Sequence, residues 1–270
     1  MVPTSTITVI IIDIILGFAV PVALSWWLIK KYKISLSTVL IGAATFIVFA
    51  LVLESIMHNI VLTGARGEAI RGNAWYYALY GGLAAGIFEE VGRYIAMKFL
   101  LIKEPTKVSP AIAYGVGHGG VEMLIIFGIG MISTLMMALM INNGQINEIM
   151  SQVPANAVDQ LQSQIDQVQT ASSASYLLGL WERASAMIMQ ISLSVLVWTA
   201  VRKGGKWSWL FPAAILIHAV VDGSLVVMQK SMSTAALEAV CFAMAIILAV
   251  FAYWVARNAF NESSSEAITE

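Results

Sequence analysis

Three apolar segments of the sequence each carry an acidic residue and a basic or imidazole residue spaced one helical turn apart. Residues four positions apart lie on the same face of a helix, so the two members of each pair point in the same direction. A charge in the hydrocarbon of a bilayer is costly, and such groups almost always face the protein interior, where they bind or react. The pairs are Glu89 with Arg93, His118 with Glu122, and His218 with Asp222. They are the first candidates for a functional site.

A buried carboxylate beside an arginine and imidazoles suits the activation of water for hydrolysis. Glu89 could act as the general base, with Arg93 orienting or tuning it. His118 and His218 could position the water or stabilise an oxyanion. Glu90 follows Glu89 directly and is turned about 100° away on a helix, so only one of the two can point squarely into a shared site.

The same residues include a candidate metal set. Catalytic zinc commonly takes three protein ligands and one water. His118 and His218 would supply two of these ligands, and the third would be a carboxylate, from Glu122 or Asp222. The chain has no His-Glu-x-x-His signature and no serine in a nucleophile elbow. The sequence leaves open whether a metal binds the water or Glu89 activates it without one.

The composition places these residues in a membrane protein. Of the 270 residues, 59% are hydrophobic and 11% are charged, whereas about 25% of a soluble domain is charged. The apolar residues form runs of about 20 or more, long enough to cross about 30 Å of hydrocarbon. A net charge of −1 gives no basis for a nucleic-acid partner, and the lone Cys241 cannot form an internal disulfide. We therefore expect an all-α, polytopic helix bundle in a lipid bilayer.

Seven transmembrane helices are predicted, and they form a single domain over residues 1–257. They cover residues 7–29, 36–62, 74–101, 109–142, 173–201, 209–229 and 234–257. The run 109–142 is long for one crossing, so it is expected to tilt or to break near its glycines.

The connection 143–172 is polar and contains no Lys or Arg. Apolar residues recur there at helical spacing between Val158 and Val168, which predicts a short amphipathic helix on the membrane or capping the bundle. A flexible loop is the alternative. The tail 258–270 is polar and is expected to be disordered.

Positive charge is shared unevenly between the two ends of the predicted helices. One end carries ten Lys and Arg residues and the other carries three, with Arg93 and Arg183 inside the spans. Cytoplasmic loops are enriched in such residues. This places the N-terminus and the connection 143–172 outside the cell, and the C-terminus with the tail in the cytoplasm.

Depth along each helix gives a further prediction, because a helix rises about 1.5 Å per residue. Counted from the cytoplasmic end, the three basic or imidazole members of the pairs lie about 12 Å inside the membrane. Their three carboxylate partners lie about 18 Å inside. The groups are therefore expected to meet in one wet pocket below the cytoplasmic surface.

Other ionisable residues lie nearer the outer face. Glu54 and Arg183 are both about 27 Å from the cytoplasmic end. An ion pair of Arg183 with Glu54 or with Glu182 would neutralise both charges. His58 is expected to be a satisfied interfacial histidine, and Asp13 is expected to reach the outer interface.

Two other classes of function are compatible with these residues. Intramembrane His, Glu and Asp form proton relays and cation sites in transporters, although the sequence shows no convincing internal repeat. A buried polar cluster can also fix helix packing in a non-catalytic scaffold that binds a partner or substrate.

The order of the motifs resembles a known family. A Glu-Glu-x-x-Arg motif at 89–93 is followed by Gly-His-Gly-Gly-Val-Glu at 117–122 and His-x-x-x-Asp at 218–222. In order, spacing and membrane placement these resemble the YhfC-type family of intramembrane metalloproteases. That family is grouped with the PrsW proteases, the CAAX prenyl and bacteriocin-processing proteases and the Aph subunit of gamma-secretase. The resemblance covers the four predicted helices from 74–101 to 209–229.

The resemblance implies a role for each motif. In the CAAX-type members the Glu-Glu motif supplies the glutamate that activates water, and later His motifs complete the site. Carried onto this chain, Glu89 is the activating base and Glu90 is the alternative. Arg93 would orient the base, and His118 and His218 would bind the catalytic water or a metal.

The chain departs from the CAAX-type pattern at three points. Its Glu-Glu-x-x-Arg motif is one residue shorter, Asp222 stands in the place of an Asn, and Glu122 follows the first His. These departures favour the YhfC and PrsW side of the group. The resemblance to Aph-like members keeps a non-catalytic scaffold as the alternative. The resemblance implies a multi-pass protein of a prokaryotic plasma membrane that cleaves a membrane-embedded protein or peptide. Zinc is the implied cofactor, a metal-free mechanism stays open, and the oligomeric state is not determined.

Overall fold

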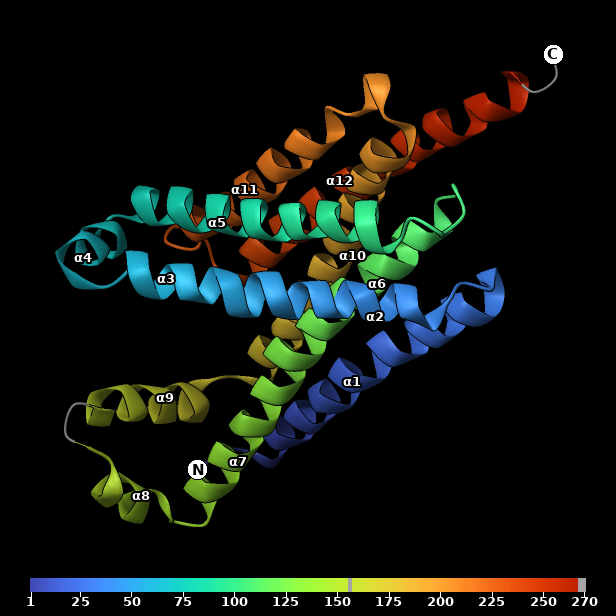
Figure 1. Ribbon diagram of the computed structural model, residues 1–270. Coiled ribbons are helices and arrows are strands. Elements are labelled where there is room, and N and C mark those ends of the chain that lie inside the picture. The colour runs from blue at the N-terminus through green and yellow to red at the C-terminus, as the bar shows by residue number, and fades with distance from the viewer. Residues whose placement is uncertain (155–156, 267–270) are drawn as a thin grey trace.

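The structure is a computed structural model that describes residues 1–154 and 157–266, and the regular elements of these residues are all helices (Figure 1). The predicted all-α class is therefore confirmed. The helices are α1 (Thr4–Tyr32), α2 (Leu36–Phe46), α3 (Ser55–Val61), α4 (Gly64–Gly72), α5 (Ala74–Ile95), α6 (Ser109–Glu122), α7 (Gly130–Asn142), α8 (Ile146–Gln152), α9 (Val158–Thr170), α10 (Ser173–Lys203), α11 (Leu210–Met228) and α12 (Thr234–Glu266).

Three π-helical segments lengthen these helices. Ile47–Glu54 joins α2 to α3, Ala96–Leu100 extends α5, and Met123–Ile129 joins α6 to α7. The predicted run 109–142 is thus continuous and does not break at its glycines. A π-turn holds more residues than an α-turn, so it changes the face on which later side chains point without ending the helix.

Six helices in the described part of the chain are long and apolar enough to cross a membrane. They are Thr4–Tyr32, Leu36–Val61, Ser109–Asn142, Ser173–Lys203, Gly205–Met228 and Thr234–Phe260. The rod of α5 and its π-helical extension is of similar length but contains Glu89, Glu90, Arg93 and Lys98. The first three of these are buried. That this rod is a seventh span, and the orientation of the bundle, stay predictions.

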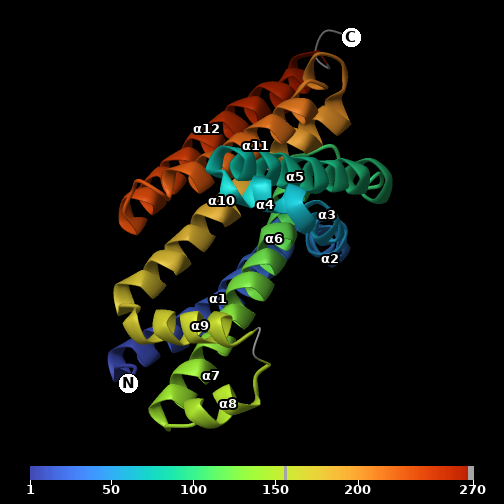
Figure 2. The same ribbon diagram turned by 90° about the vertical axis from the view of Figure 1, so that its left-hand side faces the viewer.

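Helix α10 is the central helix of the bundle. In its most apolar stretch 72% of the residues are buried, compared with 17–28% in the other five candidate spans. It packs along α12 and α6, α11 packs along α5, and α2 packs along α6 (Figures 1 and 2). Helices α5, α6, α11 and α12 therefore come together around α10.

Glycines bring the helices of the site into close contact. A Cβ at Gly82 would lie 2.3 Å from the Ala219 carbonyl oxygen on α11, so a larger side chain there would separate α5 from α11. A Cβ at Gly117 would lie 2.0 Å from the Val39 carbonyl oxygen on α2. Gly82 and Gly86 have the small-xxx-small spacing that lets membrane helices approach closely, and both meet the α11 backbone, so they hold α5 near α11 beside the acidic pair.

The connection between α7 and α10 contains the predicted amphipathic helix. Helix α9 buries Ile165 against Val2, Ala138 and Ile141, so it covers the ends of α1 and α7 (Figures 1 and 2). At the other end of the chain, α12 continues to Glu266, beyond the predicted helix end at 257. Residues 267–270 of the predicted tail lie outside the described residues, and the division into one domain and a tail stays a prediction.

Asp13 on α1 is fully buried, whereas the sequence placed it at the outer interface. Neither of its carboxylate oxygens hydrogen-bonds to another described residue. A buried polar group without a partner costs about 1–3 kcal/mol. Asp13→Val is therefore expected to raise the free energy of unfolding in detergent micelles by about 1–3 kcal/mol. The exposed Asp159→Val is the control, with little change expected; a destabilised Asp13→Val protein would contradict this prediction.

Candidate active site

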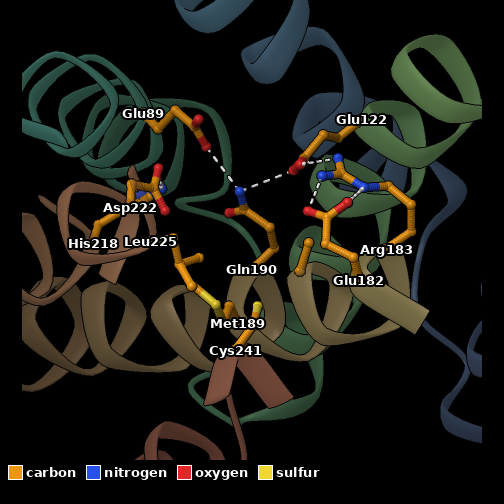
Figure 3. Close-up of a pocket in the computed structure, with 11 residues that line it drawn as sticks. Glu89, Glu122, Glu182, Arg183, Met189, Gln190, His218, Asp222, Leu225 and Cys241 are labelled. Carbon is orange, nitrogen blue, oxygen red and sulfur yellow. Dashed lines mark hydrogen bonds and ion pairs between the residues drawn. The ribbon is translucent and has the colours of Figure 1, made fainter. Parts of the chain in front are cut away.

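The bundle contains a partly open cavity of about 260 Å³ between α5, α6, α10, α11 and α12 (Figure 3). Water occupies about 30 Å³ per molecule in the liquid, so several waters can enter. The polar lining residues are Glu89, Glu122, Glu182, Arg183, Gln190, His218 and Asp222. The apolar lining residues are Ala186, Met189, Leu225 and Cys241. A cavity with an acidic lining and room for water thus lies inside an otherwise apolar bundle.

Glu89 reaches the cavity from α5, and one of its carboxylate oxygens is hydrogen-bonded to protein side chains. Its Oε2 lies 2.9 Å from His118 Nε2 and accepts a hydrogen bond from Gln190 Nε2, also at 2.9 Å. His118 is fully buried in contact with the rings of Phe46 and Tyr114 and does not line the cavity. His118 is therefore placed to orient Glu89 and does not itself reach the cavity.

Glu90 points away from the cavity. It is fully buried, with Oε1 2.9 Å from His218 Nδ1 and Oε2 3.3 Å from Arg93 Nε. The prediction that only one of the two adjacent glutamates faces the shared site is confirmed, and that residue is Glu89.

His218 lies between Glu90 and the cavity. Its Nδ1 contacts Glu90, and its Nε2 is 3.5 Å from Asp222 Oδ2. A proton on Nδ1 that is donated to Glu90 leaves Nε2 as the nitrogen that acts on the cavity side. The Asp222 side chain is 38% exposed, which makes it the most accessible of the predicted site residues that form ion pairs.

Arg93 connects α5 to α10 through contacts that are all buried. Its Nη1 donates to the Gln190 carbonyl at 2.9 Å and to Ser194 Oγ at 3.0 Å, and its Nη2 donates to Gln190 Oε1. Arg93 does not hydrogen-bond to Glu89 directly, and its contacts reach that carboxylate through Gln190, which bonds to both residues.

Glu122 and Arg183 form the opposite wall of the cavity. Arg183 Nη1 is 3.1 Å from Glu122 Oε1, and Arg183 also pairs with its neighbour Glu182. The predicted pair with Glu182 is confirmed. The alternative pair with Glu54 is wrong, because Glu54 contacts His58 one turn along its own rod at 3.2 Å.

The predicted metal set does not come together. His118 is engaged by Glu89 and enclosed by aromatic rings, His218 contacts Glu90, and Glu122 contacts Arg183. Within residues 1–154 and 157–266, no group of three or more His, Cys, Asp and Glu side chains is placed to hold a metal ion. In this arrangement the imidazoles are partners of carboxylates, and the residues do not fit a three-ligand metal site.

Gln190 is the site residue that the sequence reasoning missed. It lies in the most buried part of α10 and contacts Glu89, Glu122 and Arg93. The available signal was a single amide side chain in the long apolar run 173–203. Charge and metal-ligand spacing did not select it, because glutamine is neither ionisable nor a preferred ligand.

Comparison with known proteins matches most of the chain to one protein family. Residues 16–248 match the family described as YhfC intramembrane metalloprotease. A relative in Bacillus subtilis (strain 168), named "Uncharacterized membrane protein YhfC", is 36% identical over 244 residues, which cover 90% of this chain and 92% of the relative. No solved structure matches the chain. The matched range includes every residue that lines the cavity.

Proposed function

This chain belongs to the YhfC intramembrane metalloprotease family, and from that premise we propose that it hydrolyses a peptide bond of a membrane protein or membrane-anchored peptide with water activated by Glu89. One observation carries the proposal: Glu89 lines a cavity inside a membrane protein while two donors hold one oxygen of its carboxylate. A fixed carboxylate beside water has the geometry of a general base.

The chemistry needs one proton acceptor and one group that stabilises negative charge. Glu89 takes a proton from the water as the water oxygen forms a bond to the peptide carbonyl carbon. The carbonyl oxygen gains negative charge, and His218, with Nε2 on the cavity side, donates a hydrogen bond to it in its protonated form. The carbon–nitrogen bond then breaks, and the proton on Glu89 passes to the leaving amine.

The family description also implies a metal ion. A resident zinc would act as a Lewis acid and lower the pKa of a bound water. The described side chains do not supply three converging ligands, so no step above depends on a metal.

The metal content of the purified protein is a direct check on this arrangement. We expect sub-stoichiometric zinc after purification without chelator, because the two histidines are held by different glutamates. Elemental analysis of the wild-type chain beside His218→Ala makes the measurement. One tightly bound zinc per chain, lost in His218→Ala, would contradict the arrangement proposed here.

The proposed hydrolysis is tested with the full chain in liposomes and membrane-anchored peptide reporters. We expect cleavage within or near the half of the bilayer predicted to be cytoplasmic, and incorporation of heavy oxygen from labelled water into the new carboxyl group. Uncleaved reporters, together with a partner that co-purifies equally with wild type and Glu89→Gln, would favour the non-catalytic scaffold. Reporter-independent ion flux abolished in Glu89→Gln would favour transport.

A further inference from the structure

Gln190 lies where three charged side chains meet on the wall of the cavity. Its side chain is buried, and the residue is 5% exposed. Its Nε2 donates to Glu89 Oε2 at 2.9 Å and to Glu122 Oε2 at 3.0 Å (Figure 3). Its Oε1 accepts from Arg93 Nη2, and its backbone carbonyl accepts from Arg93 Nη1 at 2.9 Å. One residue therefore links both facing carboxylates of the cavity to the buried guanidinium.

The charges around Gln190 allow only one orientation of its amide. A guanidinium has donors and no acceptor, and an ionised carboxylate has acceptors and no donor. The amide oxygen must therefore face Arg93, and the amide nitrogen must face Glu89 and Glu122. Turning the group over would lose all three side-chain contacts at once.

The donors to Glu89 converge on a single oxygen. Gln190 Nε2 and His118 Nε2 both contact Oε2. Within the described part of the chain, Oε1 accepts no hydrogen bond from another side chain, and Glu89 lines the cavity. The two oxygens of this carboxylate are thus held in different surroundings, one bonded to protein and one open to water.

We propose that Gln190 is a positioning residue that, with His118, fixes Oε2 of Glu89 and leaves Oε1 to take the proton from the catalytic water. The proposal rests on the proposed function, since it assigns a task to Gln190 within that hydrolysis. The contact of Gln190 with Glu122 also fixes the amide relative to the opposite wall of the cavity. The Glu89 carboxylate is thereby held in a constant position relative to that wall.

Two substitutions separate this role from a merely structural one. Gln190→Glu keeps an acceptor toward Arg93 but loses both donors toward the carboxylates. Gln190→Met has similar length and loses the donors and the acceptor. We expect both to lower kcat about 100-fold, the effect of misplacing a reacting group by about 1 Å, with KM little changed. Ser192→Ala is the control, because Ser192 is buried on α10 and, among the described residues, its side chain bonds only to the Ile188 carbonyl of its own helix.

A kcat for Gln190→Glu equal to that of wild type, with only Gln190→Met impaired, would overturn the proposal. That result would show that Gln190 acts only by accepting from Arg93. Thermal unfolding of each variant in detergent shows whether a loss of kcat reflects loss of the fold.

Infrared spectroscopy gives a readout that does not depend on activity. The carboxylate band of Glu89 is the band lost in Glu89→Gln, and it is expected to shift in Gln190→Met but not in Ser192→Ala. An unmoved band in Gln190→Met overturns the proposed hydrogen bond. A shifted band without any hydrolysis by wild type would instead overturn the proposed function, so the two failures are distinguishable.

Discussion

Glu89→Gln is expected to lower kcat for reporter hydrolysis by about 1,000-fold or more, at the upper end of what a general base contributes. The amide has the shape of the carboxylate, and its oxygen can still accept from His118 and Gln190. It cannot take a proton from water at neutral pH. The fold is therefore expected to survive while the chemical step is lost. Single-turnover hydrolysis in liposomes measures kcat, and thermal unfolding in detergent checks the fold.

Glu122→Gln is the matched control for this prediction. It makes the same change in the same cavity, but Glu122 is bonded to Arg183 and Gln190 and belongs to the opposite wall. We expect it to reduce kcat far less than Glu89→Gln. The reverse order of effects would move the base from α5 to α6 and contradict the assignment.

Arg93→Leu is expected to lower the free energy of unfolding by about 3–5 kcal/mol, the usual result of removing one partner of a buried ion pair. Arg93 and Glu90 are both fully buried. The substitution leaves the Glu90 carboxylate without its cation and removes the three hydrogen bonds that Arg93 donates to Gln190 and Ser194. The Gln190 carbonyl keeps a bond from Ser194 Oγ, whereas Gln190 Oε1 loses its donor. Reversible unfolding in mixed detergent micelles measures the change.

A double variant shows whether this loss comes from the unpaired charge. Arg93→Leu with Glu90→Gln removes both charges, so it is expected to recover part of the stability lost in Arg93→Leu alone. Lys98→Leu, on the exposed side of the same rod, is expected to change the free energy of unfolding by no more than about 0.5 kcal/mol. An Arg93→Leu protein as stable as Lys98→Leu would contradict the buried-pair interpretation.

The sequence was sufficient for features that depend on one helix at a time. Apolar runs of membrane length predicted the six candidate spans, because hydrocarbon thickness sets helix length. Helical periodicity gave α9, and the angular offset between neighbours separated Glu89 from Glu90.

Contacts between helices were decided by the tertiary structure. Sequence spacing paired His118 with Glu122 and Glu89 with Arg93, yet His118 bonds to Glu89 on α5 and Glu122 pairs with Arg183 on α10. His118 and Glu89 had been placed at different depths, about 12 and 18 Å from the cytoplasmic end, and they are nevertheless in contact. A depth calculated from the rise per residue assumes a straight helix perpendicular to the membrane. It therefore omits helix tilt and the change of face at each π-turn.

What the sequence by itself determined is therefore the set of ionisable groups, the helices that carry them and the face that each group occupies. What only the tertiary structure decided is the partner of each group, and the inclusion of the neutral Gln190 between Glu89, Glu122 and Arg93. Residue spacing fixes directions within one helix, whereas the rotation and tilt of packed helices fix which of those directions meet.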